Sequence, residues 1–421
     1  MRPHAYILMV LCVVVGTGLP ITGTAKIRSQ GEIALSARTF SPDEDAQTHD
    51  HGLAASFHLD VKAKQARGFR QQLRLTGRAA SVDTDRSLLI VNDAWIGWRS
   101  QVLQLSVGAE TFNWSTAEAF HPTDSLNSRN LDSDVENPEK MGELAAKVRV
   151  RFLSGGLTLL YLPMRVAPRL PSTRSRLNWT QGTALGTTTW ADQKGKTSTG
   201  RFAPQYAARL DQTLGQTDVT LHYVAHNERM VPSLLVNPAT GEAALVFPFV
   251  ERFGGSVVSP LGDWLFKVEG EYRRYQDINT QPGLILATGA TKDHAAIAAG
   301  FDYGWSYEAG SEGTLLVEGQ VLHAAGTATK DIGLVGPFQR DVLVGYRHAF
   351  NDTEDTQFLV GIIADVERVG ECMSTLTGSQ RLNNDWKFEG KYQFIYAPNE
   401  ASLLYQQDGT HAAYLDLIRS F

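Results

Sequence analysis

The chain lacks a second long apolar segment beside its N-terminal one. Outside the run from Ala5 to Val15, no stretch approaches the roughly 20 apolar residues that a membrane-spanning helix needs. Cysteine is nearly absent, with only Cys12 and Cys372 among 421 residues. A strong charge excess is missing too, because the formal net charge is −6. These absences argue against a helical membrane protein, a disulfide-stabilised scaffold and a nucleic-acid-binding protein.

The first 25 residues have the pattern of a secretory signal peptide. A short basic head precedes the apolar run, and small residues follow at Gly23 and Ala25. The run is too short for a membrane anchor, and Leu11 stands where a lipoprotein signal has a small residue before its cysteine. We expect cleavage after Ala25 and a mature chain, 26–421, with one free cysteine and a single domain.

Two-faced segments recur along the mature chain. Residues alternate between apolar and polar over 53–63, 69–79, 144–152 and 264–273, which predicts β-strands. Soluble antiparallel sheets also alternate, so a soluble periplasmic protein is an alternative. Here, however, one face carries Arg-x-Arg or Glu-x-Glu on several strands, and no helical segment is available to cover the apolar face. In the segment 53–63, the apolar face holds Leu53, Ala55, Phe57, Leu59, Val61 and Ala63.

The connections between these strands alternate in length. Short polar links, such as those at 65–68, 99–101 and 154–156, alternate with long ones such as 113–141 and 165–200. This alternation is typical of an all-β transmembrane barrel with antiparallel up-and-down strands. At about 22 residues per strand and connection, 396 mature residues (421 minus 25) predict about 18 strands. Sixteen is the alternative, because 373–382 and 402–407 are weak strands, and either width leaves an aqueous lumen.

Tryptophans near the strand ends fit the aromatic girdles of such barrels. The candidates are Trp95, Trp98, Trp264, Trp305 and Trp386.

The last eleven residues, HAAYLDLIRSF, form a strand that runs to the chain's last position. This ending resembles the C-terminal signal of Gram-negative outer-membrane β-barrels, carried by Leu415, Leu417 and Phe421, although Arg419 departs from it. The resemblance implies insertion by the barrel-assembly machinery through this strand. It also implies residence in the outer membrane of a Gram-negative bacterium, in contact with lipid and lipopolysaccharide.

The segment 105–134 resembles porin-like outer-membrane proteins of the alginate-export and related uncharacterised families. There a strand with Gly-x-Gln or Gly-x-Glu and an aromatic pair leads into a loop with Asp and Asn-Pro. The matching residues are Gly108, Glu110, Trp114, Asp124 and Asn127, whereas Ser115 and Ser128 replace the usual Gly and Pro. The resemblance implies a porin-like barrel.

The alternation also predicts which charges line the lumen. Phe69, Leu73 and Leu75 must face lipid, because arginine at the bilayer midplane costs about 2–4 kcal/mol there. The arginines between them therefore face water, and basic walls are how pores select anions. The predicted pore-lining basic residues are Arg28, Arg38, Arg70, Arg74, Arg78, Lys147, Arg149 and Arg151, and the acidic ones opposite them are Glu269, Glu271, Asp302 and Glu318.

The long connection 113–141, called the acidic loop below, carries six acids. Beside a basic wall, these acids predict a loop that folds into the lumen and narrows it. A solvated surface loop is the alternative, and the lumen charges could also serve as salt bridges that rigidify the barrel. The predicted constriction residues are Glu118, Asp124, Asp132, Asp134, Glu136 and Glu139.

Catalytic and metal-binding signals are weak. Asp218 and His222 share a strand face but lie about 13 Å apart at this spacing, and no Gly-x-Ser-x-Gly is present. His49, Asp50 and His51 could bind a transition metal, but no second cluster supports them. We therefore expect no catalytic residue, no metal and no cofactor.

The sequence as a whole predicts an outer-membrane porin or export channel that passes small or extended anionic solutes by diffusion. Two alternatives stay open: a barrel component of an export or lipid-trafficking assembly without an open pore, and an outer-membrane hydrolase.

Overall fold

The structure is a computed structural model. It describes residues 26–42, 48–178, 186–230, 232–240, 242–280, 284–286, 292–308, 310–326, 336–368, 370–400 and 402–421. The predicted signal peptide, 1–25, lies outside these residues. Within the described part, no helix has the length and apolar character needed to cross a membrane.

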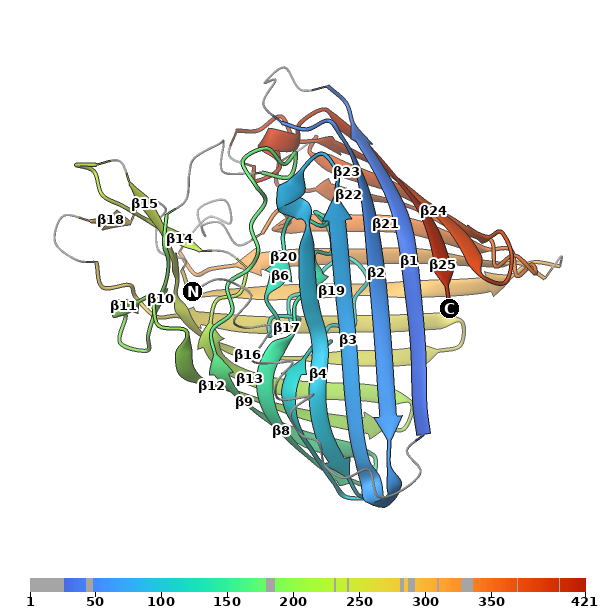
Figure 1. Ribbon diagram of the computed structural model, residues 1–421, viewed down its shortest axis with the longest axis horizontal. Helices are drawn as coiled ribbons and strands as arrows, with labels where there is room; N and C mark the ends of the chain where they lie inside the picture. Colours follow the sequence, from blue (N-terminus) through green and yellow to red (C-terminus); the bar gives the residue numbers. More distant parts are fainter. Residues whose placement is uncertain are drawn as a thin grey trace.

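Eighteen of the strands in the described residues form one closed antiparallel sheet, and Figure 1 shows the barrel that this sheet makes. Each strand pairs with the next along the chain, and β1 pairs with the last strand, β25. The barrel strands are β1 (Lys26–Phe40), β2 (His51–Lys64), β3 (Phe69–Ala80), β4 (Leu88–Arg99), β5 (Leu103–Glu110), β8 (Glu143–Phe152), β9 (Gly155–Met164), β12 (Phe202–Leu214), β13 (Thr217–Asn227), β16 (Phe249–Leu261), β17 (Trp264–Tyr275), β19 (His294–Ser306), β20 (Glu312–His323), β21 (Arg340–Ala349), β22 (Gln357–Asp365), β23 (Cys372–Arg381), β24 (Trp386–Tyr396) and β25 (Thr410–Ser420). The predicted fold class is confirmed, with 18 strands rather than 16.

The seam between β1 and β25 closes the barrel at the end of the chain. The amide of Gly31 donates to the carbonyl of Phe421 at 3.0 Å, and the amide of Phe421 donates back at 2.9 Å. The Phe421 ring covers Gly31 so closely that a Cβ at this position would collide with it. Because both edges are paired, no unsatisfied strand edge is left to face lipid.

Alternation gives the wall an apolar outer face and a polar inner face. Leu376 of β23 and Val344 of β21 point outward and are 47% and 46% exposed, whereas Glu269 and Glu318 point inward and are 1% exposed. In a soluble protein the exposed apolar surface would be costly, but lipid is a suitable solvent for it. The outer face is therefore a membrane-facing surface.

The connections confirm the predicted alternation of two rims. The short-turn rim holds two- to seven-residue links, including the 3-10 turn η1 (Ala66–Gly68). The long-loop rim holds the acidic loop, the connection 165–201 and the 3-10 turns η2 (Thr84–Arg86) and η4 (Tyr405–Gln407). The weak segment 373–382 is largely strand β23. The other, 402–407, is not a strand, because it forms a turn and η4 within the last long connection.

An aromatic belt lines the short-turn rim outside β17, β19 and β21. Trp264 lies 4.5 Å from Tyr303, and Trp305 stacks on Tyr346 at 5.8 Å, both measured between ring centroids. Trp95 does not belong to a girdle: its register opposite Gln72 places it on the lumen face with Arg70 and Arg74. A bulge in β4 shifts the pairing between Arg74 and Leu75.

The long connections also build a five-stranded sheet beyond the barrel, seen at the left of Figure 1. Its order is β11-β10-β15-β14-β18, with β10 parallel to β15, and Trp190, Leu245 and Phe247 form an apolar cluster in it. The sequence predicted loops here. The strands of this sheet are β10 (Thr188–Ala191), β11 (Thr197–Ser198), β14 (Ser233–Val236), β15 (Ala243–Phe247) and β18 (Ile285–Leu286), and the acidic loop has its own pair, β6 (Arg129–Asn130) and β7 (Glu139–Lys140).

Candidate functional site in the barrel lumen

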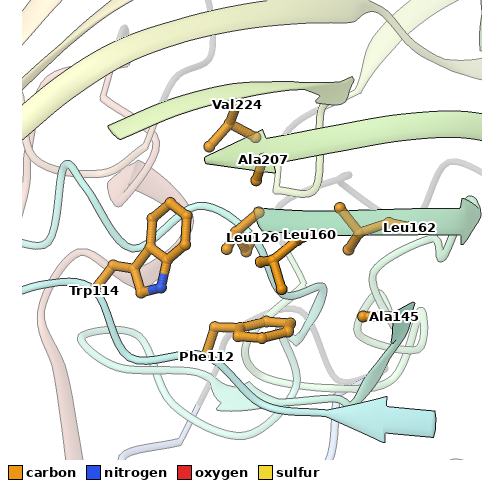
Figure 2. Packing of buried hydrophobic residues seen from close by; sticks show 8 residues of the cluster. All are labelled: Phe112, Trp114, Leu126, Ala145, Leu160, Leu162, Ala207 and Val224. Atoms are coloured by element: carbon orange, nitrogen blue, oxygen red, sulfur yellow. The ribbon is translucent and has the colours of Figure 1, made fainter. Parts of the chain in front are cut away.

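The acidic loop enters the lumen from the end of β5 and packs on its wall at two apolar places. Phe112, Trp114 and Leu126 lie against inward-facing residues of β9, β12 and β13, as Figure 2 shows. Farther along, Phe120 packs against the inner faces of β19 and β21–β24, where Leu343 and Ile363 are buried. The loop thus crosses the lumen from one part of the wall to another.

Two carboxylates of the far wall hold the crossing segment. Glu269 of β17 accepts hydrogen bonds from the Thr116 amide at 2.6 Å and from the hydroxyls of Ser115 and Thr123 at 3.0 and 3.2 Å. Glu318 of β20 accepts from the amides of residues 118 and 119 at 2.7 and 2.9 Å. Charge-assisted bonds of this kind are roughly twice as strong as neutral ones, so these predicted pore-lining acids act as loop anchors.

Most of the six predicted constriction acids reach cations on other elements. Asp134 and Glu136 bind Lys391 of β24 at 2.7 and 3.1 Å. The remaining pairs are Glu118 with Arg347 of β21, Glu139 with Arg78 of β3, Asp124 with Arg129 and Lys140 inside the loop, and Asp132 with Arg86 of η2 at 3.8 Å. The loop is therefore an ionic partner of the wall on the sides of β3, β21 and β24.

Burial perturbs the titration of several loop groups. Asp132 is 3% exposed, and its burial raises its carboxyl pKa although the Ser175 hydroxyl donates to it. Burial lowers the pKa of His121, whose ring lies 2.9 Å from the Ser115 hydroxyl. Burial also lowers the pKa of Arg86 to about 10, and the nearby Arg38 adds to this effect. The loop therefore favours a neutral His121.

Five of the eight predicted basic residues have carboxylate partners. Arg78 is bound to the acidic loop, but the other four pair with acids of the wall or its connections. Arg149 binds Asp211 at 2.6 Å, and Arg38 lies 3.7 Å from Asp83. The other pairs are Arg74 with Asp93 and Lys147 with Glu110. The lumen salt bridges considered from the sequence are thus present at these positions.

The other three, Arg28, Arg70 and Arg151, form no ion pair with a carboxylate of the described chain. All three lie at the short-turn end of their strands, and Arg70 stands opposite Lys64 in the β2–β3 register. Arg151 is repelled by Arg70, Arg99 and Arg149, and its one side-chain hydrogen bond within the described residues is to Gln104 at 3.3 Å. Arg28, Arg70, Arg99 and Arg151 are called the rim cluster below.

The acidic wall is internally neutralised. Glu271 accepts hydrogen bonds from Arg252 at 2.7 Å and Arg273 at 2.8 Å. Lys267 lies between Asp302 at 2.9 Å and Glu318 at 3.2 Å. The predicted acids Glu269, Glu271, Asp302 and Glu318 are thus placed on the lumen side and compensated by loop amides, arginines and one lysine.

Three hollows surround the acidic loop. A hollow of about 860 Å³ on its short-turn side is lined by Lys147, Arg149, Arg151 and Arg209, among others. Arg209 lies over the Trp114 ring at 5.4 Å. A second hollow, about 500 Å³, lies between the loop and the walls of β1–β3 and β21–β25, and a third, about 260 Å³, lies on the long-loop side. Space for small solutes is therefore present on each side of the loop.

His222 is not arranged as part of a catalytic triad. His222 contacts Glu271 at 3.2 Å, and Ser125 donates to the same carboxylate at 3.4 Å. The carboxylate lies between the serine and the histidine, so no hydroxyl is activated by the ring in the manner of a triad. Asp218 instead accepts from Thr213. Among the described residues, no group of three or more His, Cys, Asp or Glu has metal-binding geometry.

The predicted assembly residues lie on the outer face of β25 and at its end. Leu415 is 49% exposed and Phe421 71%, while Leu417 pairs with Leu35 and Phe388. Arg419, which departs from the apolar pattern, lies over the Trp386 ring at 5.8 Å near the short-turn rim. A cation at this depth costs about 0–1 kcal/mol, so the departure is tolerated.

Comparison with solved structures gives the same fold. Pseudomonas aeruginosa OccD3 (OpdP) aligns with a TM-score of 0.53 at 10% identity over 97% of this chain and 96% of that chain. Pseudomonas aeruginosa OccK3 (OpdO) aligns with a TM-score of 0.52 at 14% identity over 97% and 99%. The fold is that of an outer-membrane porin barrel. No family model and no curated protein matches the chain, so the resemblance to alginate-export families stays a prediction.

Several lumen residues were missed from the sequence. Arg99 fell in a segment interpreted as a turn, although β4 extends to it. Lys391, Arg347 and Arg86, which bind the acidic loop, carry no local signal that marks them as its partners, because the loop is more than 200 residues from the first two.

Proposed function

We propose that the protein is an outer-membrane channel through which small solutes diffuse, with a preference for anions. The observation that carries the proposal is the uncompensated rim cluster, of which Arg151 lines the hollow of about 860 Å³. The apolar outer face and the closed seam support a membrane location, with the short turns in the periplasm and the long loops outside.

The path of the solute decides the selectivity. The short-turn rim carries charges of both signs. The rim cluster is basic, whereas acids such as Asp352 and Asp355 lie in the connection between β21 and β22. The large hollow, however, adjoins the basic wall. Two of its lining cations, Arg151 and Arg209, have no ion pair to a described carboxylate, against one lining acid, Asp218, that has no ion pair to a described cation. Several kcal/mol of attraction become available where protein walls lower the effective dielectric. An anion on this side therefore gains more than a cation.

Reversal potentials in a planar bilayer under a potassium chloride gradient test the proposal. Chloride preference is expected, and it should be larger at low salt, where screening is weaker. A cation-selective pore would contradict the anion preference. A correctly inserted barrel without conductance would contradict the channel and favour the alternative of an assembly component, for which the anchored loop would act as a plug.

A further inference from the structure

The hollow of about 260 Å³ on the long-loop side differs in chemistry from the rest of the lumen. Its floor is the acidic loop, with Phe120 and Val135, and its walls are β19, β20 and the segments 336–338 and 403–407. Many of its lining side chains are apolar, including Leu131, Met230, Leu322, Pro337, Phe338 and Leu404. A porin lumen is normally polar, so this apolar lining indicates a binding site for an apolar group.

Several of these apolar side chains pack around Phe120 in one buried cluster, and they also line the hollow. Phe120 and Phe338 contact edge to face at 5.9 Å between centroids. Leu322 is 4% exposed on β20, next to Ala296 of β19. The volume of the hollow is slightly below that of usual small-molecule pockets, which start at about 300 Å³. It fits a body the size of one six-membered ring.

Polar groups of β17 and of η4 also line the same hollow. Arg273 donates to Glu271 through Nε and to the carbonyl of Pro122 through Nη2 at 3.1 Å. Its other terminal nitrogen has no partner among the described residues. Gln407, which is 7% exposed and lines the hollow, likewise has an amide oxygen without a described partner. The hollow therefore offers a donor and an acceptor beside an apolar wall.

The carboxylates around the hollow are already paired with cations, so none of them is left to bind an ionic ligand. Arg129, Arg252 and Arg273 face the carboxylates Asp124, Asp134, Glu136 and Glu228. Each of these carboxylates is in an ion pair. A charged ligand would have to break such a pair or stay uncompensated in a partly buried site, which is costly. An uncharged ligand avoids this cost.

We propose that this hollow is a binding site for a small uncharged amphipathic solute, with a ring-sized apolar body and a carbonyl or hydroxyl head. The body lies against Leu322, Phe338 and Leu404, and the head accepts a hydrogen bond from Arg273. The site goes beyond the anion channel, because it recognises a second class of solute by burial and not by charge.

Saturation-transfer NMR on the barrel in lipid nanodiscs tests the site with three probes. Cyclohexanone has both the ring-sized apolar body and a carbonyl head. Acetone has the carbonyl head without the ring, and cyclohexanecarboxylate has the ring with a charged head. We expect cyclohexanone to bind at least tenfold more tightly than acetone, because three more apolar carbon atoms are buried, and more tightly than the carboxylate. Stronger binding of the carboxylate, or equal binding of acetone, would overturn the proposal.

Paired variants separate the site from partition into lipid. Phe338→Gln and Leu404→Gln should each reduce cyclohexanone binding about tenfold, whereas Val258→Gln, the same kind of change in the hollow below the loop, should leave it unchanged. Heat-modifiable gel mobility shows which variants fold. Equal binding in folded Leu404→Gln and Val258→Gln protein would refute the site. The measurement needs no ion current, so its failure is distinct from failure of the channel proposal.

Discussion

The amide of Thr116 donates to Oε2 of Glu269 at 2.6 Å, which joins the acidic loop to β17 across 153 positions of the chain. The carboxylate is 1% exposed, so water cannot easily replace the loop's donors. Glu318 holds the next two amides on β20. The position of the loop inside the lumen therefore depends on two inward-facing acids of the opposite wall.

Glu269→Ala should release the loop and raise the single-channel conductance. A hydrogen bond to a charged group contributes about 1.5–3 kcal/mol, so losing one of these bonds shifts the released population by about tenfold or more. Glu389→Ala is the matched control, since Glu389 lies on the lumen side but pairs only with Lys387. The same conductance in both folded variants would show that the apolar contacts alone hold the loop.

Selectivity should depend on the rim cluster more than on the paired arginines. The double change Arg70→Glu with Arg151→Glu should move the reversal potential toward potassium. Arg74→Glu with Arg78→Glu is the control, since these residues are bound to Asp93 and Glu139, and it should have a smaller effect. The prediction fails if the control pair moves the potential as far as the rim pair.

Arginine substitutions at two neighbouring positions of β23 should differ in how much they destabilise the barrel, because one position faces lipid and the other faces the lumen. Leu376→Arg places a charge toward lipid and should destabilise the barrel by about 2–4 kcal/mol, whereas Thr377→Arg places it in the lumen at little cost. Leu376 is 47% exposed, and Thr377 lines the hollow beside β21–β25. Urea unfolding from lipid vesicles measures both. Equal losses would mean that the outer face does not contact lipid.

Acid should loosen the loop through His121. Burial lowers the pKa of this ring below its usual value of 6.5, so the contribution of His121 to the loop's stability is full above pH 6.5 and falls as the pH drops. Asp124, Glu269 and Glu318 oppose this effect, while Arg129 adds to it. Conductance measured from pH 7.5 to 5 should rise in the wild type and less in His121→Gln. An identical pH profile in both would assign the response to other groups, such as Asp132.

Closure of the barrel should be sensitive to Gly31. Gly31→Val places side-chain atoms where the Phe421 ring lies, so we expect a lower thermal midpoint of the heat-modifiable gel shift. Adding Phe421→Ala to this variant should recover part of the loss, because the collision is removed. A midpoint like that of the wild type in Gly31→Val would show that the ring can move away freely.

The faces of the strands could be predicted because alternation is local. Phe57 was assigned to the lipid face and Arg74 to the lumen by counting along their own strands, and closure of the sheet preserves that assignment. Trp95 was given a wrong position because it was assigned by its nearness to a strand end, whereas its spacing of three from Trp98 places the two rings on opposite faces. The bulge in β4 lies beyond both, where the partners of Arg74 and Leu75 are shifted. A bulge depends on how two strands pair, so the sequence of one strand gives little indication of it.

The contacts of the acidic loop could be predicted only in part. Six acids near a basic wall indicated entry into the lumen, but their partners Lys391 and Arg347 come close only when the ring of strands is complete. The outer sheet was missed for a related reason: its strands have two to five residues and gain stability by pairing with other loops. Such short segments have no periodicity of their own.

The outer sheet unites three connections that are far apart in the sequence. β10 and β11 come from 165–201, β14 and β15 from 228–248, and β18 from 276–293. In the proposed orientation this sheet lies outside the cell, where antibodies and phages would meet it. Its epitopes are therefore discontinuous, and an antiserum raised against a linear peptide from one connection should recognise the denatured chain better than intact cells.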